Sequence, residues 1–220
     1  MITLPDPKQA WEHENGFYLT CDVSRLSKLL AHYELFKLVV DVPGAIVECG
    51  VFKGASFARF AMMRQLFGGP RSKKMIGFDS FGPFPETAHE ADKKLRAGFT
   101  SEAGDESIDV RQLQDVLAAK KCDDAVTLIA GNICDTVPKY VADNPQLKIA
   151  LLNLDTDVYE PAVTVLEHLW PKVEHGGILL LDDYGVFPGE TLAVDEYFRG
   201  RKEKVRKLAF AMTPCHVVKE

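Results

Sequence analysis

The sequence lacks any apolar run approaching the ~20 residues needed to cross a bilayer. Its first eight residues are polar and contain prolines, without the apolar centre of a signal peptide. We therefore expect no membrane partner and a cytoplasmic protein. The cysteines support this expectation, because an odd number of scattered thiols without a C-x-x-C pair fits neither a disulfide framework nor a thiolate zinc site. They are Cys21, Cys49, Cys122, Cys134 and Cys215.

A concentrated stretch of basic residues is also missing. The formal net charge is −6, and the densest basic segment, residues 199–207, is interrupted by Glu203. This argues against a nucleic-acid partner. With 220 residues, 46% hydrophobic and 26% charged, the chain is typical of one soluble globular domain covering residues 1–220.

Neither common phosphate-binding glycine motif is present. There is no G-x-x-x-x-G-K-[ST] loop, and the turn from Gly50 to Gly54 has Phe52 where the dinucleotide motif G-x-G-x-x-G requires its middle glycine. The turn therefore suits a ligand without a pyrophosphate, which argues against NAD. A helix N-terminus near Ser56 offers free N–H groups to an anion. Two glycines after a strand are equally consistent with an ordinary turn.

Short apolar runs alternate with helical patterns along most of the chain, which predicts a doubly wound α/β domain with a mostly parallel sheet. The predicted strands are 45–49, 74–78, 126–130, 149–154 and 177–181. The predicted helices between and after them are 56–67, 161–173 and 191–198.

Two segments stand apart from this alternation. Residues 1–43 predict an N-terminal helical cap with helices at 11–18 and 24–40, the second capped by Ser24. Their apolar faces either cover the site or pair two subunits, and we favour a homodimer. Residues 80–117 predict a long lid-like insert with one short helix near 91–97.

Acidic residues follow the predicted strands. Asp155 ends one strand, and Asp182 with Asp183 ends the next. Ligands in such folds lie beyond the carboxyl ends of the strands, and three clustered carboxylates repel unless a cation neutralises them. We therefore predict a hard divalent cation such as Mg²⁺ at these three residues. Asp157 is a further acid in the same turn, whereas Glu160 is better interpreted as a helix cap.

Asp79, at the end of the second strand, is placed to accept hydrogen bonds from two ribose hydroxyls, or else to cap a turn. Together these segments resemble the macrocin O-methyltransferase family, which acts on sugars of antibiotics. The resemblance spans about residues 44–200 and rests on VECGVFKG (47–54), GFDSFG (77–82), LDTDVYEP (154–161), the 176–185 segment ending LDDYG, and AVDEYF (193–198).

The resemblance implies a class I methyltransferase fold, a seven-stranded sheet whose last strand is antiparallel and supplied by residues 209–218. It implies S-adenosylmethionine as cofactor. The methionine end would be held by Glu48, Gly50, Gly54 and Ser56, with Asp155 beside it. Asp79 would bind the ribose, and the adenine would be framed by Ser80, Phe81, Gly131 and Asn132.

The implied reaction is methyl transfer to a hydroxyl of a sugar or another vicinal diol, with the cation orienting and activating that hydroxyl. Besides the ligand Asp155, the candidates for the catalytic base are Asp157, His89 and His216. A catechol-type O-methyltransferase is an alternative, although Val158 stands where such enzymes carry a lysine. A non-catalytic domain that kept the cofactor fold is another.

Overall fold

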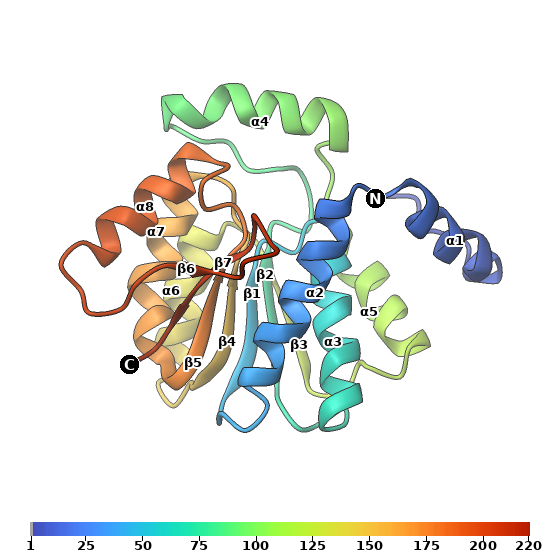
Figure 1. Ribbon diagram of the computed structural model, residues 1–220, viewed down its shortest axis with the longest axis horizontal. Coiled ribbons are helices and arrows are strands. Elements are labelled where there is room, and N and C mark those ends of the chain that lie inside the picture. The colour runs from blue at the N-terminus through green and yellow to red at the C-terminus, as the bar shows by residue number, and fades with distance from the viewer. Residues whose placement is uncertain (1) are drawn as a thin grey trace.

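The computed structural model describes residues 2–220 and contains a seven-stranded sheet in the order β3-β2-β1-β4-β5-β7-β6 (Figure 1). Strands β1 to β5 pair in parallel, β7 is antiparallel to β5, and β6 is antiparallel to β7. The predicted doubly wound sheet with an antiparallel last strand is thus confirmed. The strands are β1 (Ala45–Cys49), β2 (Met75–Asp79), β3 (Val126–Ala130), β4 (Ile149–Leu154), β5 (Val173–Leu181), β6 (Arg206–Lys207) and β7 (Cys215–Val218).

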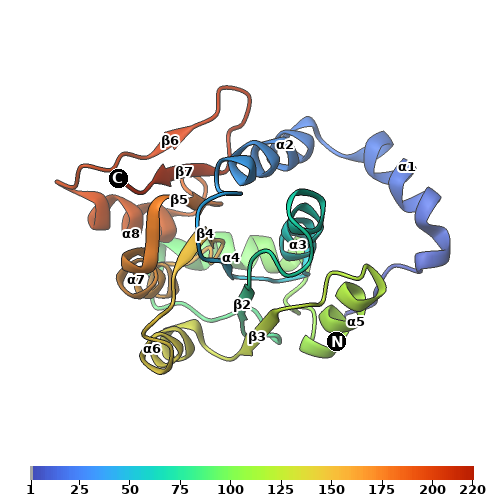
Figure 2. The ribbon, with the colours of Figure 1, turned by 90° about the horizontal axis from the view of Figure 1, so that it is seen from below.

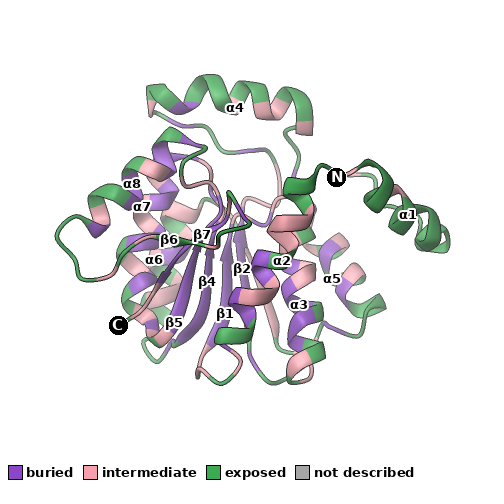
Figure 3. Cartoon of the chain, viewed as in Figure 1, coloured by how far each residue is buried: buried purple, intermediate pink, exposed green. Residues whose placement is uncertain are grey.

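Helices cover both faces of the sheet. One buried cluster joins it to α6, α7 and α8, and a second joins it to α2, α3 and α5 (Figure 2). The core strands are buried on both sides, which explains their uninterrupted apolar sequences (Figure 3). The helices are α1 (Ala10–Thr20), α2 (Val23–Leu38), α3 (Ala55–Phe67), α4 (Glu90–Ala103), α5 (Val110–Ala119), α6 (Ile133–Asp143), α7 (Tyr159–His168) and α8 (Pro188–Phe198), with 3-10 turns η1 (Pro7–Gln9) and η2 (Trp170–Lys172).

The pairing of β4 with β5 brings the two acidic strand ends together. Leu154 lies opposite Leu181 in the register, so Asp155 and Asp182 leave neighbouring strands at the same edge. The Asp182 amide donates to the Leu154 carbonyl at 3.0 Å, which fixes the two ends relative to each other. This adjacency, expected from the sequence, is confirmed.

Several predicted element boundaries were wrong. Helix α2 is capped by Asp22, whose carboxylate accepts from the Ser24 amide at 2.8 Å, and Ser24 lies inside the helix. Helix α7 ends at His168 because a 3-10 turn containing Pro171 leads into β5, which begins four residues before the predicted strand. Helix α6 was not predicted, and Pro138 lies within it.

The insert at 80–117 is largely helical, containing α4 and α5 where a loop with one short helix was expected. Helix α4 crosses above the carboxyl ends of the strands (Figure 1). Its buried Asp92 accepts from the Gly189 amide at 2.7 Å and the Tyr159 amide at 3.1 Å, at the first turns of α8 and α7. The insert is therefore attached to the two helices beside the site, and its function as a lid stays a prediction.

Helix α1 projects away from the sheet and has no buried residue (Figures 1 and 3). Among residues 2–220, none of the helices combines the length and hydrophobicity needed to cross a membrane.

Candidate active site

The turn after β1 passes directly against the end of β4. Gly50 has φ +93°, and a Cβ placed on it would lie 1.7 Å from the carbonyl oxygen of Asp155. Only glycine fits both the left-handed backbone and this close approach. Gly54, also with positive φ, precedes the first residue of α3, and no side chain caps that helix. The first residues of α3, Ala55 and Ser56, line a cavity that also contains the strand-end acids, so this uncapped N-terminus lies at the site.

Asp79 holds this turn in place. One of its carboxylate oxygens accepts from the Val51 amide at 2.8 Å and the Phe52 amide at 2.9 Å, and the other accepts from the Phe81 amide at 2.7 Å. The interpretation of Asp79 as a turn cap is therefore confirmed. Asp79 also lines a cavity, so ribose binding stays a proposal beside it.

The first cavity lies between the β1 turn and the ends of β2, β3 and β4. Six of the ten residues predicted to bind the cofactor line it, namely Gly50, Asp79, Ser80, Gly131, Asn132 and Asp155. Gly131 has φ +134°, and Asn132 caps α6 by accepting from the Cys134 amide. Phe84, Pro85 and Ser107 of the insert also line the cavity. Of the remaining predicted residues, Ser56 lines a second cavity, and Glu48, Gly54 and Phe81 line neither.

Three carboxylates meet at the ends of β4 and β5. Oxygens of Asp155, Asp157 and Asp183 all lie within 4.8 Å of one another. Burial, followed by the charges of neighbouring carboxylates, raises the pKa of each of these three groups well above its usual range. Asp157 reaches the cluster from a left-handed backbone conformation (φ +63°). The sequence identified two of these three residues as metal ligands and placed Asp157 nearby.

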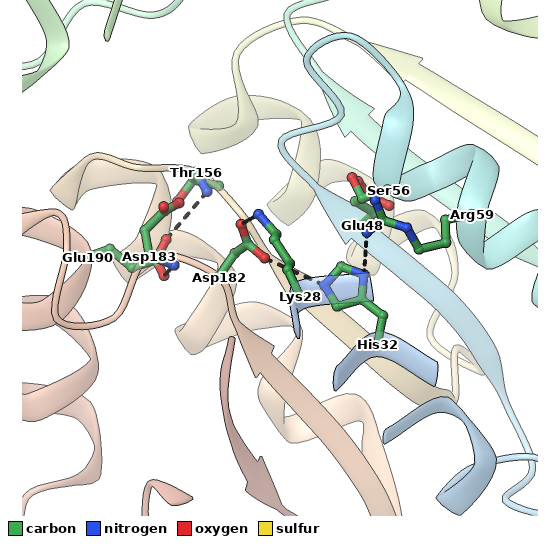
Figure 4. A network of polar contacts seen from close by, with 9 residues as sticks. All are labelled: Lys28, His32, Glu48, Ser56, Arg59, Thr156, Asp182, Asp183 and Glu190. Atoms are coloured by element: carbon green, nitrogen blue, oxygen red, sulfur yellow. Dashed lines mark hydrogen bonds and ion pairs between the residues drawn. The ribbon is translucent and has the colours of Figure 1, made fainter. Parts of the chain in front are cut away.

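Asp182 is positioned differently from the expectation of a three-aspartate metal set. Its carboxylate forms an ion pair with Lys28 of α2, and His32 Nε2 lies 3.6 Å from its other oxygen (Figure 4). Burial alone would raise the pKa of Asp182, but the charges and hydrogen bonds of Lys28 and His32 together outweigh it and lower the pKa. The cation beside Asp182 is therefore a side chain of the N-terminal segment.

A further acid, Glu190, holds the backbone beside the cluster. The buried carboxylate of Glu190 in α8 accepts from the Asp183 amide at 3.1 Å and the Thr156 amide at 3.4 Å (Figure 4). The buried oxygens Asp182 Oδ1 and Asp183 Oδ2 have no hydrogen-bond partner among residues 2–220. Carboxylate oxygens gathered in a group of partly buried acids are the donor set that a hard divalent cation prefers, so these residues fit such an ion.

The other polar network lies on the α3 side. Glu48 is fully buried, and one of its oxygens accepts from the Ser56 hydroxyl (Figure 4). Burial raises the pKa of Glu48 to about 8. Arg59, one turn after Ser56, contacts His32 Nδ1 at 3.0 Å. Neither Lys28, His32 nor Arg59 was identified from the sequence, although Lys28 and His32 stand four residues apart, the spacing of one helix face.

Two proposed bases lie away from the cluster. His216 is on β7, opposite Leu180, and lines neither cavity described above. His89 caps no group with its side chain and stacks on Tyr159 with ring centroids 5.2 Å apart. Glu160, interpreted as a helix cap, instead accepts from the Thr87 hydroxyl at 2.9 Å and the Ala88 amide at 2.8 Å, which ties the insert to α7.

A second cavity of about 560 Å³ opens on the other side of the acids. Its acidic wall contains Asp155, Asp157, Asp182 and Asp183, and residues of α2, the turn after β1, α3 and α4 form the rest. Phe52, Asp155 and Asp157 line both cavities. Two ligands, one in each cavity, would therefore meet at Asp155 and Asp157.

The sequence of residues 20–209 matches the family model described as Macrocin-O-methyltransferase (TylF). The chain belongs to the macrocin O-methyltransferase family. The resemblance seen in the sequence motifs is thus confirmed over most of the chain.

Curated members of the macrocin O-methyltransferase family are similar over part of their length. A tetracenomycin rhamnosyl 4'-O-methyltransferase from Streptomyces olivaceus is 31% identical over 170 residues, covering 74% of this chain and 61% of the relative. Demethyldecarbamoylnovobiocin O-methyltransferase from Streptomyces niveus is 30% identical over 171 residues, covering 71% and 59%. The chain thus spans about three fifths of the length of the curated relatives it matches.

Solved structures agree with this membership. The crystal structure of CalS11, a calicheamicin methyltransferase, superposes with a TM-score of 0.80 at 30% identity, covering 97% of this chain and 86% of CalS11. An apo structure of CalS11, described as a TDP-rhamnose 3'-O-methyltransferase, gives a TM-score of 0.72 at 29% identity over 97% and 87% of the two chains. The O-methyltransferase NovP shares the fold, with a TM-score of 0.72 at 22% identity over 90% and 80%.

Proposed function

We propose that this protein transfers a methyl group from S-adenosylmethionine to a hydroxyl of a sugar, with a divalent cation such as Mg²⁺ at the strand-end acids. The observation that carries the proposal is the meeting of Asp155, Asp157 and Asp183 at the wall that the two cavities share, with Asp155 and Asp157 lining both. Family membership supports methyl transfer. The names of the relatives support a sugar acceptor, since they include a rhamnosyl compound and TDP-rhamnose.

The residues that line the first cavity suit the adenosine part of the cofactor, with Asp79 beside the ribose and Asn132 beside the base. This cavity has a volume of about 60 Å³ and would have to widen to admit it. The methionine part would reach past Gly50 toward Ser56 and the N-terminus of α3, which line the second cavity. In this arrangement the sulfonium methyl group would face Asp155 and Asp157. The acceptor sugar would enter from the second cavity.

We assign cation binding, proton removal and backbone orientation to different acids. Asp155 and Asp183 would hold the cation, with Asp182 beside them between Lys28 and His32. When bound, the cation supplies positive charge that makes an acceptor hydroxyl easier to deprotonate. Asp157 is the proposed base, because it lines both cavities and its carboxylate lies at the cluster. Glu190 fixes the backbone amides of Asp183 and Thr156 and so orients this group.

One observation favours the catechol-type alternative, which requires a lysine base: Lys28 forms an ion pair with Asp182 at the acidic cluster. Burial would lower the pKa of Lys28, but the carboxylates of Asp182 and Asp155 raise it overall. Lys28 is thus held protonated and is a poor base. A non-catalytic cofactor-binding domain is disfavoured by the same cluster, because buried acids without a role only destabilise the fold.

The test is transfer of labelled methyl from S-adenosylmethionine to dTDP-L-rhamnose and to methyl α-L-rhamnoside, with Mg²⁺ and with EDTA. We expect labelled product from at least one acceptor, lost in EDTA. Asp157→Asn should lose product by about 100-fold or more while still binding S-adenosylhomocysteine. Product formed equally well by Asp157→Asn would remove Asp157 as the base.

We propose, in addition, a homodimer. Helix α1 and the start of α2 carry strongly exposed apolar side chains, with Trp11 77%, Leu19 83% and Val23 78% exposed. Light scattering on wild type and on Trp11→Ser with Leu19→Ser tests this. A monomeric wild type would exclude it.

A further inference from the structure

A group of polar side chains lies inside the apolar layer between helix α2 and the sheet. Glu48 of β1 is the register partner of Asn153 of β4, so their side chains point to the same face of the sheet. Two residues earlier on the same strands, Ile46 and Leu151 belong to the apolar cluster shared with α2 and α3. Glu48 and Asn153 therefore face these helices, and both side chains are fully buried.

Asn153 has no hydrogen-bond partner for either end of its side-chain amide among residues 2–220. Burying an amide without a partner is strongly unfavourable, and most buried polar atoms in proteins bond to the chain or to ordered water. The register places Asn153 between Glu48 and the apolar Leu180. Glu48 has an unpartnered oxygen as well, Oε2, whereas its Oε1 accepts from Ser56.

His32 of α2 brings a donor to the same layer. Arg59 can only donate, so His32 Nδ1, at 3.0 Å, is the acceptor, and Nε2 carries a proton. Nε2 lies 3.6 Å from Asp182 Oδ1, and neither atom has a hydrogen-bond partner in the described part of the chain (Figure 4). A water molecule can bridge two polar atoms at such a distance. Burial raises the pKa of Glu48 and the charge of Asp182 adds to this, so the two carboxyls are near each other.

The unpartnered atoms of this layer complement one another. Two are donors, the amide nitrogen of Asn153 and His32 Nε2. Three are acceptors, on Glu48, Asn153 and Asp182. A buried water accepts and donates hydrogen bonds, and so satisfies polar groups that do not reach one another. We propose that these four residues bind internal water beneath α2, with Asn153 as its main anchor.

This water connects the two halves of the site. It contacts Glu48, which we place at the methionine end of the cofactor, and Asp182, beside the acids proposed to hold the cation. Asn153 is thereby a positioning residue, because it orients Glu48 through the water and contacts no substrate. The effect on cofactor binding rests on the proposed function, whereas the water site does not.

The sign of a stability change tests the water. Asn153→Leu keeps the approximate shape of the side chain and removes both polar atoms. If the layer held no water, this variant would lose an unpaired amide and melt at a higher temperature than wild type. With water bound, the variant leaves the partners of that water unsatisfied, and we expect the melting temperature in EDTA to fall by about 3 °C or more.

Asn153→Ser and Asn153→Ala form a matched pair, because they leave similar space and differ by one hydroxyl. Serine keeps an anchor for water, so we expect the serine variant to melt above the alanine variant. In a layer without water the buried hydroxyl would be unpaired and the order would reverse. The pair decides the question even if the leucine variant does not fold.

Two further measurements complete the test. A crystal structure of the metal-free protein should show ordered water within about 3.2 Å of the Asn153 amide. Calorimetry with S-adenosylhomocysteine should show about a tenfold loss of affinity in Asn153→Ala, with most of it restored in Asn153→Ser.

The water site is overturned if Asn153→Leu melts above wild type, or if the alanine variant melts above the serine variant. A crystal structure in which the Asn153 amide bonds directly to Glu48 would also overturn it. Unchanged cofactor affinity in Asn153→Ala would overturn the positioning role. A wild type that binds no S-adenosylhomocysteine would instead remove the proposed function, since the melting and crystallographic results need no cofactor.

Discussion

Lys28 of α2 and Asp182 after β5 form an ion pair across 154 positions of the sequence. Their side chains are 18% and 2% exposed, so this pair is largely shielded from water. It attaches the N-terminal helical segment to the acidic edge of the sheet. It also places a fixed positive charge where a divalent cation would bind.

Replacing Lys28 by Met should therefore have two opposite effects. The metal-free protein should lose about 3 kcal/mol of stability, because Asp182 stays buried without its partner. Mg²⁺ should bind about tenfold or more tightly, because the competing charge is gone. Urea unfolding in EDTA and Mg²⁺ calorimetry measure the two effects. Lys53→Met, which removes a lysine of the same cavity bonded to the Ala103 carbonyl, is the control. Unchanged or weaker Mg²⁺ binding in Lys28→Met would contradict the competition.

Glu48 makes stability depend on pH. Burial raises its pKa to about 8 from an ordinary 4.5, so the folded protein keeps a proton that the unfolded chain releases between these values. Stability therefore falls as pH rises through this window, by about 3 kcal/mol between pH 5 and 8 from this group. Glu48→Gln lacks this contribution. Urea unfolding in EDTA should show the stability of wild type relative to Glu48→Gln declining with pH, and a constant difference would refute it.

Asp92 should hold α4 in place. Its carboxylate accepts from the Gly189 and Tyr159 amides, and Asp92→Ala would leave both without their partner. We expect a loss of about 2 kcal/mol and faster trypsin cleavage within α4. Glu90→Ala is the control, because that side chain is exposed and pairs with Lys93 in the same helix. Equal cleavage rates in the two variants would show that Asp92 does not anchor the helix.

Gly50→Ala should disrupt the site through a steric clash. The new methyl group would lie 1.7 Å from the Asp155 carbonyl oxygen, so the β1 turn and the β4 end must separate. We expect either an unfolded protein or loss of S-adenosylhomocysteine affinity by about 100-fold. Gly69→Ala is matched in backbone, with φ +90° against +93°, but has open space and should cost only about 1 kcal/mol. Circular dichroism and calorimetry distinguish the outcomes, and normal binding by Gly50→Ala would contradict this geometry.

The sheet and its acidic edge could be predicted because their signal is local. Buried parallel strands such as β4 are continuous apolar runs, and Asp155 and Asp182 directly follow them. Helix α4 was predicted, but too short. The residue that it buries is an acid, Asp92, so the helix carries little apolar periodicity that a sequence pattern could show. Helix α6 was missed because Pro138 interrupts its pattern.

The polar contacts around the acids could not be predicted, because they join distant segments. Lys28 and His32 meet Asp182 only once α2 packs over the sheet, and Glu190 reaches Asp183 only through the turn into α8. His216 was a candidate base from residue type alone, and the strand pairing of β7 places it opposite Leu180.

The central claim is that this chain binds S-adenosylmethionine and a divalent cation at adjacent sites. The most direct test is calorimetric titration of S-adenosylmethionine and of Mg²⁺ into wild type and into Asp182→Asn with Asp183→Asn. We expect saturable cofactor binding to both proteins and a Mg²⁺ heat in wild type alone. A folded wild type that binds no S-adenosylmethionine would contradict the account.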